Sequence, residues 1–212
     1  MIRAAAWFGS EDYGVLVPGG PSWKKSSPPF SATAAILALI GRPIKYYSRM
    51  TTEARLCLCA ASIALRAVPN PQSGDREIGL LGAGGEGFLQ ANQEYFRDYV
   101  ASGRTMGRGN LFIYTLPTSA LGEVAIALSL AGPCMFLQDD SHPLASIIKH
   151  TRQIVTDGEA DLMLGLWSNT QAALCMAIDA EPGDNPIAAM LSASKSNPSQ
   201  LIQQLQKTVP PA

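Results

Sequence analysis

Four polar residues, Asp139 to His142, stand between an apolar run and a helical pattern that begins at Pro143. Chemistry in α/β proteins collects where a strand ends and a helix begins, because free backbone amides and the helix dipole converge there. Ser141 could act as a nucleophile with His142 as its base. Neighbours in sequence rarely present their side chains to each other, however, and no G-x-S-x-G turn surrounds Ser141. We therefore favour helix capping by Asp139, Asp140 or Ser141, with Asp140 and Ser141 preferred.

A glycine-rich segment, Gly82 to Gly87, has the formal pattern G-x-G-x-x-G between a predicted strand and a predicted helix. Backbone amides in such a turn can hold a pyrophosphate. The dinucleotide fingerprint also requires the first strand-to-helix turn and an acidic residue about 20 positions later. Ser102, Gly103 and Arg104 stand there instead. A tight turn is therefore the better interpretation, and we expect no nucleotide and no other cofactor.

Two arginines, Arg104 and Arg108, lie in the glycine-rich stretch GRTMGRGN. Such a basic loop could contact a phosphate-bearing cofactor arm or an acidic carrier protein. The alternative is that both guanidinium groups are solvated on a turn.

The four cysteines lie in apolar surroundings, and no histidine stands at metal-ligand spacing from them. We predict buried, reduced thiols at all four positions and no metal site. They are Cys57, Cys59, Cys134 and Cys175.

The composition describes a compact, weakly charged chain of 212 residues. Hydrophobic residues make up 47% of it and charged residues 16%, with a formal net charge of -1. This balance argues against binding to nucleic acid or an anionic membrane surface. Residues 1–14 lack a secretory signal, and the longest uncharged apolar run, 32–40, is half the length of a membrane span. We expect a cytoplasmic protein without a membrane span.

Strand and helix patterns alternate along the chain. Short apolar runs predict strands at 2–8, 77–81, 134–138, 161–167 and 172–178. Helical spacing predicts helices at 32–40, 52–68, 88–100, 117–131 and 143–156, and the apolar helix at 117–131 should be buried on most sides. Residues 17–29, rich in Gly, Pro and Ser, are expected to form a loop.

This order predicts an α/β fold, βαβαβαββ, with a five-stranded mixed sheet covered by helices on both faces. The last two strands follow each other too closely for a crossover helix, so one should run antiparallel at an edge. We expect one domain over residues 1–182 and a polar C-terminal tail, 183–212, with a short amphipathic helix at 199–207.

Several segments resemble the N-terminal half of the β-ketoacyl synthases, condensing enzymes of the thiolase superfamily. The likeness covers roughly residues 1–180 and implies a thiolase-like half. It rests on Arg49-Met50 with the Ala-rich continuation to Ala64-Leu65, on Ile78-Gly79-Leu80 before the glycine turn, on LPTSALGEVAIALSLAGP from Leu116 to Pro133, and on GEADLMLGL from Gly158 to Leu166.

The chain departs from this family at the nucleophile. The family places a catalytic cysteine at the start of the helix after the Gly-Pro strand, and Ser141 occupies that place here, with Cys134 seven residues too early. The family's second half, which supplies the assisting histidines or lysine, has no counterpart in this sequence. A serine hydroxyl without a base is a far poorer nucleophile than a thiolate, so we expect no independent condensing activity.

The resemblance implies a ketosynthase-like subunit similar to a chain-length factor. It would pair with a full-length β-ketoacyl-ACP synthase in fatty-acid or polyketide biosynthesis, including the aryl-polyene type, and shape chain length or carrier docking. Arg104 and Arg108 are the candidate contacts to the acyl carrier protein. The candidate partner surface comprises Thr115, Leu116, Pro117, Thr118, Cys134 and Phe136. An unpaired thiolase half should also expose apolar surface, which predicts obligate association.

Two alternatives from other functional classes remain open. One is an acyltransferase or thioesterase that uses Ser141, with His142 or a partner's residue as its base. The other is a homo-oligomeric protein that binds acyl groups or coenzyme A without turning them over.

Overall fold

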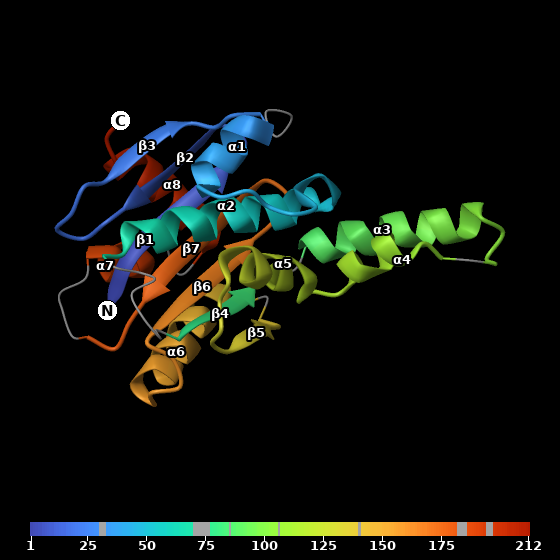
Figure 1. Ribbon diagram of the computed structural model, residues 1–212. Helices are drawn as coiled ribbons and strands as arrows, with labels where there is room; N and C mark the ends of the chain where they lie inside the picture. The colour runs from blue at the N-terminus through green and yellow to red at the C-terminus, as the bar shows by residue number, and fades with distance from the viewer. Residues whose placement is uncertain are drawn as a thin grey trace.

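A computed structural model describes residues 1–29, 33–69, 77–84, 86–105, 107–139, 141–181, 186–193 and 197–212. Its centre is one seven-stranded sheet in the order β3-β2-β1-β7-β6-β4-β5 (Figure 1). The strands are β1 (Ile2–Gly9), β2 (Asp12–Leu16), β3 (Trp23–Ser26), β4 (Ile78–Ala83), β5 (Cys134–Leu137), β6 (Leu162–Ser168) and β7 (Ala172–Ile178). β4 runs parallel to β5 and β6, whereas β7 runs antiparallel to both of its neighbours, β6 and β1.

The sheet corrects two expectations. The five expected strands are present, but the sheet has seven, because β2 and β3 continue it beyond β1 as antiparallel neighbours. β3 lies in the segment expected to be a loop, where WKKS lacks the apolar character of a buried strand. The last two strands are antiparallel as expected, yet neither is at an edge, since β1 and its hairpin continue the sheet past β7.

Ten helical segments accompany the sheet in the described residues. The α-helices are α1 (Thr33–Ile40), α2 (Thr52–Ala67), α3 (Glu86–Ala101), α4 (Gly109–Phe112), α5 (Ser119–Leu128), α6 (Pro143–Thr156), α7 (Pro186–Ala193) and α8 (Pro198–Thr208). Two short 3-10 helices are η1 (Tyr47–Arg49) and η2 (Ile113–Thr115).

Helix α2 forms the centre of the layer on one face of the sheet. The Thr51 hydroxyl caps it by accepting a hydrogen bond from the Ala54 amide at 3.3 Å, and it ends before Pro69. Its apolar side chains join one core with those of α1, α5 and the strands. Contrary to expectation, α5 buries only one side: Leu121 and Val124 are buried, whereas Ile126 is 80% exposed. Its sequence, in which Glu123 is the one charged residue, does not reveal this difference between its faces.

Helices α6, α7 and α8 cover the other face of the sheet and form a second core with it (Figure 1). The expected tail contributes to this layer, because α8 buries Leu201, Ile202 and Leu205. The chain then runs beside β3, where the Lys24 amide donates to Pro210 O at 3.0 Å. The C-terminal residues therefore cover the β3 edge of the sheet. The expected domain boundary at residue 182 lies outside the described residues.

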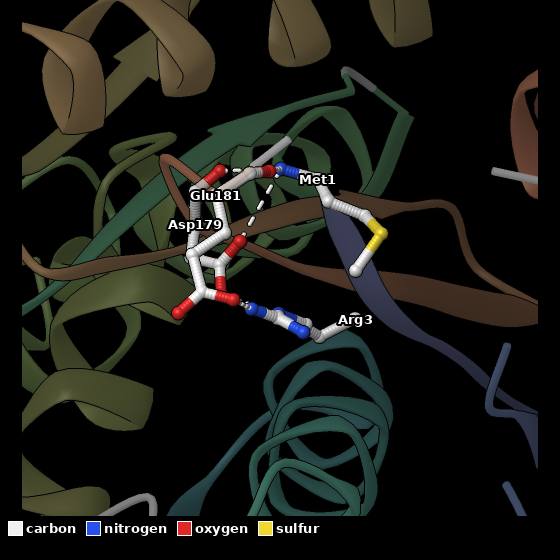
Figure 2. A network of polar contacts seen from close by, with 4 residues as sticks. All are labelled: Met1, Arg3, Asp179 and Glu181. Atoms are coloured by element: carbon white, nitrogen blue, oxygen red, sulfur yellow. Dashed lines mark hydrogen bonds and ion pairs between the residues drawn. The ribbon is translucent and has the colours of Figure 1, made fainter. Parts of the chain in front are cut away.

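A network of ion pairs joins the start of β1 to the end of β7. Figure 2 shows the Asp179 carboxylate between the Met1 amine and the Arg3 side chain. The Met1 amine donates to Asp179 Oδ1 at 3.2 Å and to the Glu181 carbonyl at 2.8 Å, and the Arg3 guanidinium pairs with the Asp179 and Glu181 carboxylates. These contacts tie together two strands that are neighbours in the sheet and far apart in sequence.

Helices α3 and α4 with η2 project from the body of the molecule (Figure 1), and we call this segment, residues 86–115, the arm. Its base is held by side-chain hydrogen bonds. The Tyr114 hydroxyl donates to Glu123 Oε1 of α5 at 2.9 Å, and Asn92 Nδ2 donates to the Thr115 carbonyl at 3.3 Å.

In the described part of the chain, no single helix is long and apolar enough to cross a membrane. Two consecutive segments, Gly109–Thr115 and Ser119–Leu128, are together long and apolar enough to do so, but the chain bends by 98° between them.

Candidate functional site

The turn between β5 and α6 is organised by Asp139. Its Oδ1 accepts the backbone amides of Ser141 at 3.1 Å and His142 at 2.9 Å, and its Oδ2 accepts the Ser146 hydroxyl at 2.5 Å. These hydrogen bonds, above all that of Ser146, hold the pKa of the Asp139 carboxyl below its usual value. A side-chain cap from Asp139, Asp140 or Ser141 was predicted, but the N-cap residue of α6 is His142, whose side chain makes no capping hydrogen bond. Asp139 instead accepts the amides of the turn that leads into the helix, and Asp140 lies outside the described residues.

Ser141 and His142 are both exposed at this turn. Within the described residues, the Ser141 hydroxyl makes no hydrogen bond to a histidine or a carboxylate that could activate it, and only its backbone amide is engaged, by Asp139. Among the described residues, these groups do not form a nucleophile with its base.

The glycine-rich turn after β4 makes room for protein atoms. A Cβ on Gly82 would lie 2.6 Å from Leu121 Cδ2 of α5, and one on Gly84 would lie 2.5 Å from the Ser168 carbonyl oxygen. Gly84 also has φ +137°, which side chains rarely allow. Both glycines therefore permit close packing at the carboxyl ends of β4 and β6, in agreement with the tight-turn interpretation. Gly85 lies outside the described residues.

A small pocket lies beside this turn, where the start of α2, the end of β6 and the base of the arm meet. Its lining includes Glu53, Cys57, Gly84, Tyr114 and Ser168. The Ser168 hydroxyl donates to Glu53 Oε1 at 2.6 Å. Burial raises the pKa of the Glu53 carboxyl, an effect that the Ser168 hydrogen bond partly offsets. The free volume, about 30 Å3, is comparable to that of one water molecule.

The buried carboxyl predicts a pH-dependent stability that Glu53→Gln removes. A raised pKa means that the folded chain holds the proton more tightly than the unfolded chain, so folding stability falls as pH rises through that pKa. Glutamine still accepts the Ser168 hydrogen bond but cannot ionise. In urea titrations, the unfolding free energy of the wild type should fall relative to that of Glu53→Gln between acid and neutral pH. A constant difference between the two proteins would contradict a raised pKa.

Three of the four cysteines are buried thiols, as predicted. Burial raises the pKa of Cys59 to about 12 and raises those of Cys57 and Cys175 further. The prediction was wrong for Cys134, which is exposed because β5 is the last strand of the sheet. Partial burial raises the pKa of Cys134 too, so none of these groups is a ready thiolate. Among the described residues, no three His, Cys, Asp or Glu side chains gather around a possible metal position.

The residues proposed for a partner surface fall into two neighbouring places. Thr115 ends η2, and Leu116, Pro117 and Thr118 form the turn into α5. Cys134 and Phe136 lie on the edge strand β5. Leu116, Pro117 and Phe136 also line the small pocket, so the structure brings members of both sets together.

The two arginines differ in their environment. Arg108 is paired with Asp98 of α3: its Nε and one terminal nitrogen donate to the carboxylate at 2.9 and 2.5 Å. Arg104 is exposed just past α3, in a left-handed conformation with φ 61°, and makes no ion pair with any described residue. The sequence showed the two arginines as equivalent, because the Asp98 partner lies ten residues away on a helix.

Comparison of the sequence with models of protein families and with curated proteins gives no match. Solved structures do match in fold. A chain of a ketosynthase in complex with its chain length factor from Xenorhabdus doucetiae aligns with a TM-score of 0.54 and 11% identity, over 85% of this chain and 78% of that chain. The ishigamide ketosynthase/chain length factor aligns with a TM-score of 0.53 and 16% identity, over 78% of this chain and 58% of that chain.

A third similar structure is a type II PKS acyl-carrier protein in complex with its ketosynthase bound to the hexaketide. It aligns with a TM-score of 0.50 and 11% identity, over 84% of this chain and 63% of that chain. The chain thus spans less than two thirds of the chains matched in the second and third structures. At these identities the likeness concerns the fold: this chain has the thiolase-like α/β fold of the ketosynthase/chain length factor complexes.

Proposed function

We propose that this chain is a ketosynthase-like subunit without condensing activity of its own, which pairs with a ketosynthase and contributes to the control of chain length or carrier docking. The observation that carries the proposal is an open sheet edge, β5, beside a cluster of exposed apolar side chains. All but one of the strongly exposed large apolar residues in the described chain lie between 89 and 135, on the arm, the turn that follows it, α5 and β5. Exposed apolar surface of this kind is typical of protein interfaces.

The two edges of the sheet differ in whether another segment of the chain runs beside them, and this difference supports the proposal. The β3 edge is covered, because residues 210–212 run beside Lys24. β5 ends the sheet on the other side, with Cys134 and Met135 exposed. An uncovered strand offers backbone donors and acceptors to a second chain. A partner strand on β5 would lie next to the arm, since α5 contacts both β5 and η2.

The chemistry of the described residues supports a non-catalytic role. The thiol nearest to the expected nucleophile position, Cys134, sits at the start of β5 with a raised pKa, and Ser141 lacks an activating base. A condensing enzyme needs an activated thiolate, which these groups do not provide. Two neighbours in fold are described as ketosynthase and chain length factor together, which supports a paired function.

Arg104 is the better of the two candidate contacts to an acyl carrier protein. Its guanidinium is exposed and makes no ion pair among the described residues, whereas the charge of Arg108 is balanced by Asp98. An acidic carrier would gain a new ion pair from Arg104 but would have to compete with Asp98 for Arg108.

Cys134→Pro tests the pairing through β5. The Leu80 amide donates to Pro133 O at 2.7 Å, so the Pro133 carbonyl faces β4 and the Cys134 amide, by alternation along the strand, faces away. Proline removes that outward donor while the β4–β5 ladder is kept, and it is tolerated at the first residue of a strand. In native mass spectrometry of the complex purified from its host, the wild type should carry a heavier ketosynthase companion, and Cys134→Pro should lose it.

Cys134→Ser is the matched control, because it keeps the backbone amide and should retain the companion. A monomer of the wild-type chain would overturn the proposal. A homo-oligomer that carries acyl or coenzyme A ligands would favour the binding-protein alternative, and an acyl group on Ser141 would favour the enzymatic one.

A further inference from the structure

A second, larger groove lies near the opposite end of the sheet from β5, between the β2–β3 hairpin and helices α1 and α2. Its volume is about 580 Å3, within the range of ligand pockets. Val15 and Ile63 are buried against the core beneath it, and Leu39 of α1 lines one side. Tyr13 and Trp23 line another side, with their rings edge to face at a centroid distance of 5.6 Å.

Helix α1 contributes apolar side chains that remain exposed at the groove. Its sequence, TAAILALI, has no polar side chain after Thr33, yet only Ile36 and Ile40 are buried. Ala35 and Ala38 are exposed and line the groove. An apolar helix that presents small side chains to an open groove leaves space for a hydrocarbon chain of a ligand.

Two cations, and no carboxylate, are among the residues that line the groove. Lys25 lies with its Nζ 5.7 Å from the centroid of the Trp23 ring. Arg66 donates from Nη1 to the Leu39 carbonyl at 2.8 Å, which fixes its side chain against α1. Both side chains are exposed, and neither forms an ion pair with a described residue. An apolar cleft with two unneutralised cations is complementary to a molecule with an apolar tail and an anionic head.

We propose that the groove between the β2–β3 hairpin and α1–α2 binds a fatty carboxylate, with its chain along Trp23 and α1 and its carboxylate between Lys25 and Arg66. This site is separate from the partner surface at β5 and does not depend on the proposed pairing. A carboxylate suits the two cations because Arg66 can donate to it while Lys25 supplies a second charge.

Tryptophan fluorescence tests the site directly. Trp23 is the tryptophan in the groove, whereas Trp7 and Trp167 belong to the core on the other face of the sheet. A fatty acid that carries bromine on its chain, titrated below its micellar concentration, should quench part of the fluorescence saturably. Trp23→Phe should remove that saturable part and leave the remaining emission unquenched. Quenching that persists in Trp23→Phe would place the ligand elsewhere and overturn the proposal.

The role of the charges is tested separately. Lys25→Glu with Arg66→Glu should weaken binding about tenfold or more, as expected for the loss of charge-assisted contacts. Lys149→Glu with Arg152→Glu makes the same change on exposed positions of α6 and should leave binding unchanged. The methyl ester of the same acid, added to the wild-type chain, should also bind about tenfold more weakly or worse. Equal binding of acid and ester would overturn the proposal even if the charge variant failed to fold.

Discussion

Replacement of Leu201 and Leu205 by alanine together is expected to remove most of the stability of the fold. Both side chains are fully buried on α8, one turn apart, in the core on the α6 side of the sheet. Each leucine-to-alanine change in a core costs about 2–5 kcal/mol, whereas a domain has about 5–15 kcal/mol in total. Urea denaturation followed by circular dichroism should show a transition shifted far towards low urea, or none.

The control for this prediction lies on the other side of the same helix. Gln203 and Lys207 are exposed, and alanine at both positions should change the unfolding free energy by about 0.5 kcal/mol or less. If the double leucine variant unfolds as the wild type does, α8 is a dispensable tail and not a layer of the fold. The result bears on how the chain is built, because α7 and α8 cover apolar sheet surface that would otherwise have to be buried by a partner.

The elements predicted correctly from the sequence are those whose apolar character is strong enough to decide their structure locally. The strands that became β4, β6 and β7 are almost wholly buried, and most of the helix predicted at 52–68 is buried too. Most side chains in these segments are therefore apolar, and the apolar pattern alone identifies the element. β3 could not be recognised, since WKKS has one apolar residue and the last two residues of the strand are exposed. It is a strand because β2 and the C-terminal residues pair with it, which is a tertiary effect.

The candidate site was less predictable for a related reason. Glu53 and Ser168 form a hydrogen bond although they are 115 positions apart in sequence. From the sequence alone, Glu53 is simply an acidic residue in the first turn of a helix. A side-chain cap was predicted at 139–142, but His142 is the N-cap residue and Asp139 binds the turn before the helix. This arrangement depends on backbone geometry that adjacent polar residues do not reveal. The exposure of Cys134 likewise depends on strand order, which the apolar pattern of one strand does not specify.

Leu89 and Phe96 of the arm, replaced together by glutamate, are expected to abolish pairing with the ketosynthase while leaving the fold intact. Leu89, Phe96 and Val100 recur at helical spacing along α3 and are 54%, 61% and 41% exposed. Tyr95 instead packs towards α4, with its ring 5.6 Å from that of Phe112. Tyr95 of α3 therefore packs within the arm, whereas the stripe of Leu89, Phe96 and Val100 faces outward.

Exposure of an apolar stripe to water is unfavourable, and a partner that covers the stripe would remove this free-energy cost. If the stripe lies within the interface, each substitution should cost about 2 kcal/mol or more of binding free energy. Together the two substitutions should weaken pairing by about three orders of magnitude. The unfolding free energy should change by about 0.5 kcal/mol or less, because both side chains are exposed in the isolated chain. The companion mass should vanish from native spectra of this variant but persist in Ala145→Glu with His150→Glu, which adds the same two charges on exposed positions of α6. If the companion mass persists in both variants, the outward stripe of α3 is not part of the interface, and pairing would then be assigned to β5 without the arm.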